Sequence, residues 1–111
     1  MRNNKTTIIS SLIKIEGNLE LEGSVRIDGN IKGDINSKGN LIIGSSGSVE
    51  SNMKAENVLV AGNYKGDMRA EGIVKIRSTG KFEGNLYQKD RGRLEIEKGG
   101  LFKGRSDVLS E

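Results

Sequence analysis

The sequence predicts an all-β fold, a parallel β-helix (β-solenoid), from three observations. Glycines and apolar residues recur together in a heptad, G-x-h-x-G-x-h, in which h is apolar. Short h-x-h segments lie between the heptads and alternate as a strand with one buried face does. The 111 residues include 16 glycines and no proline, which indicates a chain that turns often without a ring-locked φ.

The heptad occurs five times, at intervals of 18, 15, 18 and 20 residues. Self-similarity at such a period is typical of solenoids. The pattern loosens at Ser51, which replaces a glycine, and at Ser106, which replaces the final apolar residue. The copies are GNIKGDI from residue 29, GSVESNM from 47, GNYKGDM from 62, GKFEGNL from 80 and GLFKGRS from 100.

The N-terminal segment indicates how long each side of a turn is. Three apolar pairs there are spaced six residues apart: Ile13/Ile15, Leu19/Leu21 and Val25/Ile27. Three such segments make 18 residues, so each repeat is expected to form one turn of a coil with three flat faces. With strands stacked ~4.8 Å apart, about five to six turns would give a rod roughly 25 to 30 Å long.

Two internal ladders and a corner follow from this geometry. The first apolar residues of the heptads are expected to stack on one another, and so are the second ones. Asp or Asn at the corner suits a turn, because both residues tolerate the left-handed backbone and hydrogen-bond locally. The first ladder is Ile31, Val49, Tyr64, Phe82 and Phe102, the second is Ile35, Met53, Met68 and Leu86, and the corner residues are Asp34, Asn52, Asp67 and Asn85.

A chain of this length forms one domain. We expect the β-helix over 8–104. The segments outside the pattern, 1–7 and 105–111, are expected to be flexible tails.

The composition argues against an enzyme. The chain has no histidine and no cysteine, which removes the commonest general base and the commonest soft metal ligands, so we expect no catalytic residue and no metal site. Neither GxxxxGK[ST] nor GxGxxG occurs, so we expect no cofactor. Three aspartates, Asp28, Asp34 and Asp67, lie at corner or outward positions, where a structural role is expected.

The charge pattern indicates a solvated surface of mixed sign. The net charge of +3 comes from 18 basic and 15 acidic residues that interleave, so we expect no nucleic-acid partner. No stretch approaches the roughly 20 apolar residues of a membrane-spanning helix. The start, MRNNKTT, lacks the apolar core of a signal peptide, so we expect the cytoplasm, with the inner face of the cytoplasmic membrane as a second position.

The two ends of the predicted solenoid carry the functional hypothesis. Terminal turns expose unpaired backbone groups and an open core, and soluble monomers normally cap them. No cap can be read here, and the last turn finishes with Leu101 and Phe102. Phe102 is therefore either a core residue covered by the tail or the anchor of a contact between ends.

A second surface is indicated by the middle residues of the h-x-h segments, which should point outward. Ile42 and Leu59 are neighbours there. They are interpreted either as isolated exposed aliphatic residues, which are common, or as a lateral contact.

The segments TII at 7–9, IEGNLELEGSVRIDGNIKGDI at 15–35 and GGLFKG at 99–104 resemble the bactofilins, bacterial cytoskeletal proteins. The resemblance implies a three-sided, right-handed β-helix. It also implies filaments that form without nucleotide by end-to-end stacking, with roles in cell shape, envelope growth or protein positioning. The alternative is a discrete β-helical oligomer that serves envelope proteins as a scaffold or adaptor.

The resemblance further implies two polymerisation surfaces, because the family's phenylalanine of the last turn maps onto Phe102. Partners would be copies of the chain itself and, beyond them, cell-envelope or cell-wall-modifying proteins. MRNNKTT has only two basic residues and no bulky apolar one, so weak or no direct membrane binding is expected. The surface at the C-terminal end would comprise Phe102, Leu101 and Phe82, and that at the N-terminal end Ile13, Ile15, Leu19 and Leu21.

Overall fold

The computed structural model describes residues 6–10, 13–89 and 92–109 of the chain. Its regular structure consists of strands, which form a 6-stranded and a 7-stranded sheet by parallel pairing. The predicted all-β solenoid is confirmed. The strands are β1 (Thr6–Ile9), β2 (Lys14–Glu16), β3 (Leu19–Leu21), β4 (Ser24–Ile27), β5 (Asn30–Ser37), β6 (Asn40–Ile43), β7 (Ser48–Ala55), β8 (Asn57–Val60), β9 (Asn63–Ala70), β10 (Ile73–Ile76), β11 (Lys81–Lys89), β12 (Arg93–Ile96) and β13 (Leu101–Leu109).

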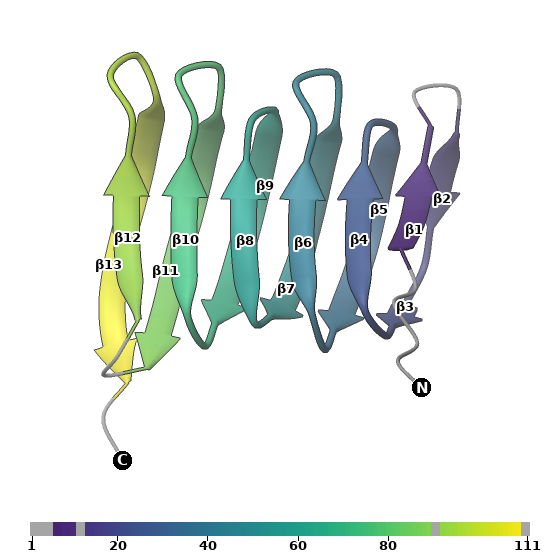
Figure 1. Ribbon diagram of the computed structural model, residues 1–111, viewed down its shortest axis with the longest axis horizontal. Coiled ribbons are helices and arrows are strands. Elements are labelled where there is room, and N and C mark those ends of the chain that lie inside the picture. Colours follow the sequence, from purple (N-terminus) through teal and green to yellow (C-terminus); the bar gives the residue numbers. More distant parts are fainter. Residues whose placement is uncertain (1–5, 11–12, 90–91, 110–111) are drawn as a thin grey trace.

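The chain winds as a right-handed coil. In Figure 1 the short strands from β4 to β12 point upward in front, the long strands point downward behind them, and successive turns advance to the left. The first and last turns therefore lie at opposite ends of the coil. Its extents are 34, 32 and 24 Å, so the molecule is nearly as wide as it is long, and the predicted rod is a short block.

A corner divides each long strand between two faces of the coil, and in every long strand except β7 this corner is a glycine. Gly33, Gly66 and Gly84 lie near the middle of β5, β9 and β11, with φ angles of 136°, 129° and 131°. The short strands β2 and β3 pair with β5 on either side of Gly33. Each turn thus has the predicted three faces: a short strand, the first half of a long strand and its second half.

The left-handed residue at these corners is glycine and not the neighbouring Asp or Asn. In the described part of the chain no residue other than glycine has a positive φ, so the predicted role of the corner residues was wrong in this respect. Glycine is required because a Cβ on Gly84 would collide with the carbonyl oxygen of Gly66 in the previous turn. The hydrogen bond between corner residues joins two turns and is not local, since Asn85 Nδ2 donates over 3.1 Å to Asp67 Oδ1 of the previous turn.

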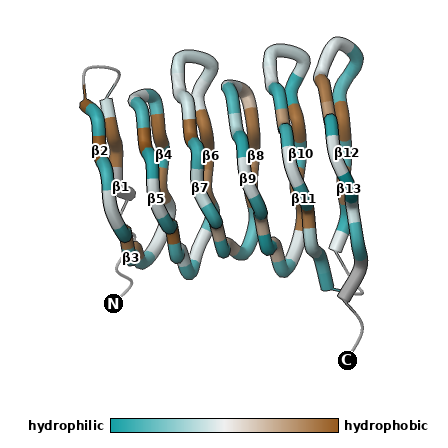
Figure 2. The backbone as a smooth tube through the Cα atoms, turned by 180° about the vertical axis from the view of Figure 1, so that it is seen from behind, coloured by the Kyte–Doolittle hydropathy of each residue, from teal (hydrophilic) through white to brown (hydrophobic). Residues whose placement is uncertain are grey.

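The two predicted ladders form the core. Parallel register places Ile31 beside Val49, Tyr64 beside Phe82, and Phe82 beside Phe102. The second ladder, from Ile35 through Met53 and Met68 to Leu86, is buried throughout. Figure 2 shows hydrophobic segments recurring along successive turns. The third face supplies the inward residues of the short strands, among them Val25, Ile27, Leu41, Ile43, Val58, Val60, Val74 and Ile76.

The unequal repeat intervals are absorbed by the connections between strands. The β4–β5 and β8–β9 connections are residues 28–29 and 61–62, whereas β6–β7 is the four-residue turn 44–47. That turn closes when Gly47 N donates to Gly44 O over 2.8 Å. The strands therefore stay in register although the turns differ in length.

One corner lacks its glycine. The β7–β9 pairing breaks at Ser51 and Asn52, where the other long strands pair through a corner glycine. The Tyr64 hydroxyl lies inside the coil, 2.7 Å from Ser51 O and 2.8 Å from Asp67 O, and donates to carbonyls at this gap. Burial raises the pKa of the Tyr64 phenol well above its ordinary value. Tyr64 therefore has two roles: its ring packs in the core, and its hydroxyl supplies a hydrogen-bond donor at the corner where the strand pairing is interrupted.

The strands extend beyond the predicted β-helix limits of 8–104 on both sides, and the domain boundaries themselves stay a prediction. β1 begins at Thr6, and β13 continues through residues 105–109, in register with β11. Residues 1–5 and 110–111 of the predicted tails lie outside the described residues.

Replacing Gly84 with alanine should lower the free energy of unfolding by at least about 2 kcal/mol, because the Cβ meets backbone of the previous turn. Gly17→Ala is the matched control, since Gly17 has a φ of 124° and nothing within 4 Å of its Cβ position. It should cost only about 1 kcal/mol of backbone strain. Denaturant unfolding followed by circular dichroism measures both, and equal losses would contradict the collision.

Replacing Tyr64 with phenylalanine should cost about 1 to 3 kcal/mol, because carbonyls of Ser51 and Asp67 lose their buried donor. The ring itself should fit, since Phe82 occupies the next rung. The folded-state pKa exceeds the unfolded value of about 10, so wild-type stability should be complete below pH 10 and fall as the pH rises above it. Denaturant unfolding at pH 8 and above pH 10 tests this. A Tyr64→Phe protein with the wild-type pH dependence would refute the assignment to Tyr64.

Candidate polymerisation interface

The C-terminal end of the solenoid presents an uncovered layer of the core. β12 and β13 are the terminal strands of the two sheets and pair on one side only, with β10 and β11. Ile96 continues the column of Ile76, but Ile76 is 0% exposed and Ile96 is 46% exposed, because no further turn of the described residues covers Ile96. Leu94 and Phe102 are partly buried in the same layer.

Phe102 completes an aromatic stack that runs into the core. Its ring lies 4.9 Å from that of Phe82 at an interplanar angle of 10°, and the Phe82 ring lies 5.0 Å from that of Tyr64 at 25°. Stacked pairs of this kind contribute about 0.5 to 1.5 kcal/mol beyond their buried area. One face of Phe102 is thus fixed by Phe82, and the side chain is partly exposed at the end of the coil.

The other two residues predicted for this surface lie elsewhere. Phe82 is 0% exposed, one layer inside the end, so it contributes only as the support of Phe102. Leu101 is 45% exposed and lies in an outward column beside Lys81, on the flank of the coil.

Two residues of the end layer were missed by sequence reasoning. Leu94 and Ile96 form the last h-x-h pair, and they occupy inward positions. The same reasoning that selected Phe102, an inward position in a turn with no successor, would have found them.

The N-terminal end is the counterpart of this layer. Ile15, Leu19 and Leu21 are partly buried against the core, and their register partners in β5 are Ile31, Ile35 and Ser37. Ile13 is 42% exposed, and its carbonyl accepts a hydrogen bond of 3.0 Å from Asn30 N. The four predicted residues are therefore in the first turn, three of them at inward positions.

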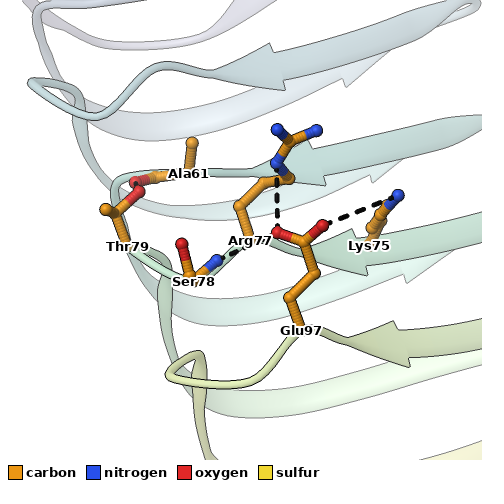
Figure 3. A network of polar contacts seen from close by, with 6 residues as sticks. All are labelled: Ala61, Lys75, Arg77, Ser78, Thr79 and Glu97. Atoms are coloured by element: carbon orange, nitrogen blue, oxygen red, sulfur yellow. Dashed lines mark hydrogen bonds and ion pairs between the residues drawn. The ribbon is translucent and has the colours of Figure 1, made fainter.

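A polar network fixes the last turn to the turn before it (Figure 3). Glu97 Oε1 accepts one hydrogen bond of 3.2 Å from Ser78 N. Glu97 also forms ion pairs with Arg77, at 3.2 Å between Oε1 and Nε, and with Lys75, at 3.8 Å between Oε2 and Nζ. Thr79 Oγ1 donates to Ala61 O over 2.7 Å, and this bond joins the loop between β10 and β11 to the connection between β8 and β9 in the previous turn. These exposed contacts are individually weak, but those of Glu97 hold the loop that connects β12 to β13, and that of Thr79 holds the loop that connects β10 to β11.

The predicted lateral contact consists of neighbours, as expected. Ile42 and Leu59 are register partners on the outer side of β6 and β8, and both are half-buried. Two half-buried side chains make a small apolar surface, and their role in a contact stays a prediction.

The aspartates have structural contacts. Asp28 pairs with Arg26 over 3.1 Å, and Asp67 accepts from Asn85. Within residues 6–10, 13–89 and 92–109 no cluster of three or more metal-ligating side chains occurs. The same residues include no helix with the length and apolar character needed to cross a bilayer.

A β-solenoid whose terminal strands have unpaired edges and partly exposed apolar residues belongs to a class of proteins whose terminal turns can continue into another molecule. Comparison with known families identifies the family. Residues 7–107 match the family described as Bactofilin, polymer-forming cytoskeletal, and the chain therefore belongs to the bactofilin family.

Solved structures agree with this membership. A Thermus thermophilus bactofilin, reconstructed by cryo-EM as double helical filaments, is 32% identical with a TM-score of 0.84, and the alignment covers 95% of this chain and 99% of that one. The cytoskeletal bactofilin BacA, solved by solid-state NMR, is 32% identical with a TM-score of 0.75 and 96% coverage of each chain. No curated protein matches the chain.

A third structure is the crystal structure of a mutant Thermus thermophilus bactofilin. It is 32% identical with a TM-score of 0.77, and the alignment covers 84% of this chain and 100% of that one. All three alignments span most of both chains, so the similarity concerns the whole solenoid.

Proposed function

We propose that this bactofilin assembles end to end, without nucleotide, into filaments that support cell shape, envelope growth or the positioning of other proteins. The observation that carries the proposal is the aromatic stack of Tyr64, Phe82 and Phe102, which ends with the partly buried Phe102 in a turn that no further strand covers in the described part of the chain. A second copy placed on this layer would continue the core.

Two driving forces support assembly at the ends. Burial of Leu94, Ile96 and Phe102 removes apolar surface from water, at about 25 cal/mol per Å². The free edges of β12 and β13 also carry backbone N–H and C=O groups that can pair with strands of another subunit. The partly buried Ile15, Leu19 and Leu21 of the first turn offer the same two features at the opposite end.

Independence from nucleotide is supported by the chemistry of the proposed contact. An apolar layer with free strand edges is competent to associate as it folds, and it needs no phosphate to order it. The sequence has neither of the common phosphate-binding loops. The double helical filaments of the Thermus thermophilus relative give a precedent for self-assembly within the family.

The proposed partners are copies of this chain and, beyond them, cell-envelope or cell-wall-modifying proteins. The proposed location is the cytoplasm, including the inner face of the cytoplasmic membrane, with weak or no direct binding to lipid. The role is structural and not catalytic, in keeping with the family description.

Purified protein should form filaments in buffer free of nucleotide and of divalent metal, because the ends associate through side chains and backbone already in place. Negative-stain electron microscopy and sedimentation, with and without added ATP or GTP, measure this. Closed oligomers or monomers under all conditions would favour the scaffold alternative. Filaments that need a nucleotide would contradict the mechanism.

Phe102→Arg should leave the β-sheet spectrum intact and raise the critical concentration for assembly at least ~100-fold, since burying an unpaired charge costs several kcal/mol and ~1.4 kcal/mol is tenfold. Leu101→Arg is the matched control, because the same charge then lies on the flank and not in the end layer. It should polymerise nearly as the wild type does. Equal behaviour of the two variants would place the contact elsewhere.

A further inference from the structure

One outward column of the coil alternates perfectly in charge. Parallel register places one residue of each turn beside its equivalent in the next, and these six residues are alternately glutamate and lysine along the whole coil. All six are exposed. The column, called the Glu/Lys column here, is Glu16, Lys32, Glu50, Lys65, Glu83 and Lys103.

The charges of this column are free to meet a partner. Among the described residues, every ion pair within 4.0 Å involves other side chains, such as those of Arg26 and Asp28 or of Lys89 and Glu71. Alternation within the chain avoids like charges between adjacent strands. It leaves six extended charged groups on one flat face of the coil.

The column is complementary to itself when it is reversed. Read from the other end, glutamate becomes lysine at every position, so a second copy with its coil axis antiparallel faces each charge with the opposite one. Glu16 then faces Lys103, Lys32 faces Glu83, and Glu50 faces Lys65 of the second copy, each twice by symmetry. A shift by one turn would place like charges opposite each other throughout.

The neighbouring column on the same face is compatible with this arrangement. It consists of exposed residues that contain no carboxylate, and reversal places none of its lysines opposite another lysine. Its residues are Lys14, Asn30, Ser48, Asn63, Lys81 and Leu101. Two-fold pairing about an axis parallel to the strands is therefore free of like-charge contacts on both columns.

We infer that the Glu/Lys column is a lateral docking surface for a second copy of this chain, which joins subunits of neighbouring filaments with their coil axes antiparallel. The inference rests on the proposed end-to-end assembly. A single set of exposed ion pairs is weak, whereas a filament presents the set many times, and the effective concentration of each further pair is high.

Salt dependence is the first test, with the filaments themselves as the internal control. Exposed ion pairs are screened when the Debye length falls to about 3 Å at 1 M salt, whereas the apolar contact between ends is not weakened. Electron microscopy should show bundled or paired filaments at about 0.05 M NaCl and single filaments at about 1 M. Bundles that persist at high salt, or filaments that stay single throughout, would overturn the inference.

Charge reversal gives a sharper test. Glu50→Lys places lysine opposite Lys65 of the partner twice, and should reduce the bundled fraction about tenfold or more. The double variant Glu50→Lys, Lys65→Glu restores every pairing between copies, and should restore bundling. Within the chain both variants create the same number of adjacent like-charge pairs, so rescue reports on contact between copies and not on stacking within one.

Glu56→Lys controls for net charge, because Glu56 is exposed and lies outside this face. It should bundle as the wild type does. Dispersal by Glu56→Lys, or a double variant that stays dispersed, would refute the lateral surface while filaments remain. Absence of filaments in the wild type would instead refute the proposed function.

Discussion

Parallel stacking of each turn directly on the one before is the constraint on which this structure depends. Strand after strand, the hydrogen-bonded register places a residue beside its equivalent in the adjacent turns, from Glu16 beside Lys32 to Glu83 beside Lys103. Each side chain therefore has to pack beside the side chains at the equivalent position of the turns before and after it. Inward columns satisfy this mainly with apolar residues, corner columns mainly with glycine, and one outward column with alternating charge.

The same constraint explains where the chain departs from regularity. A serine at one corner interrupts the pairing of β7 with β9, and the structure responds with the only hydroxyl in the aromatic column, that of Tyr64. Ser51 Oγ is a buried polar atom without a hydrogen-bond partner among the residues that the structure describes. The defect is thus compensated through its carbonyl and not through its side chain.

Much of the fold could be predicted because the sequence shows two periods, the alternation of apolar residues within a strand and the recurrence of the glycine heptad from turn to turn. The alternation of Leu41 and Ile43 fixes a strand face, and the glycines of GNIKGDI fix a corner. The assignment of the left-handed φ to Asp and Asn failed because sequence preference does not reveal the approach of Gly66 O to Gly84. That requirement comes from the neighbouring turn, which only the register defines.

The candidate surfaces were predictable to different degrees for the same reason. Phe102 was found because it ends a ladder, whereas Leu101 was assigned by adjacency in sequence, although adjacent strand residues face opposite sides. Five members of the Glu/Lys column are the fourth residues of the five heptads, so their alternation of lysine and glutamate could be read from the sequence. That these residues lie side by side, with Glu16 as a sixth member, is established by the parallel register of the strands.

In the proposed end-to-end assembly, the partly buried ring of Phe102 would make folding and assembly one continuous process. A new subunit would add to the end of the coil in the way that a new turn adds to the turns already folded, by covering an aromatic ring with the next layer. The unfavourable surface of a filament is then confined to its two tips, whatever its length. A population of such filaments lowers its total free energy by having fewer tips, which favours few long filaments over many short ones.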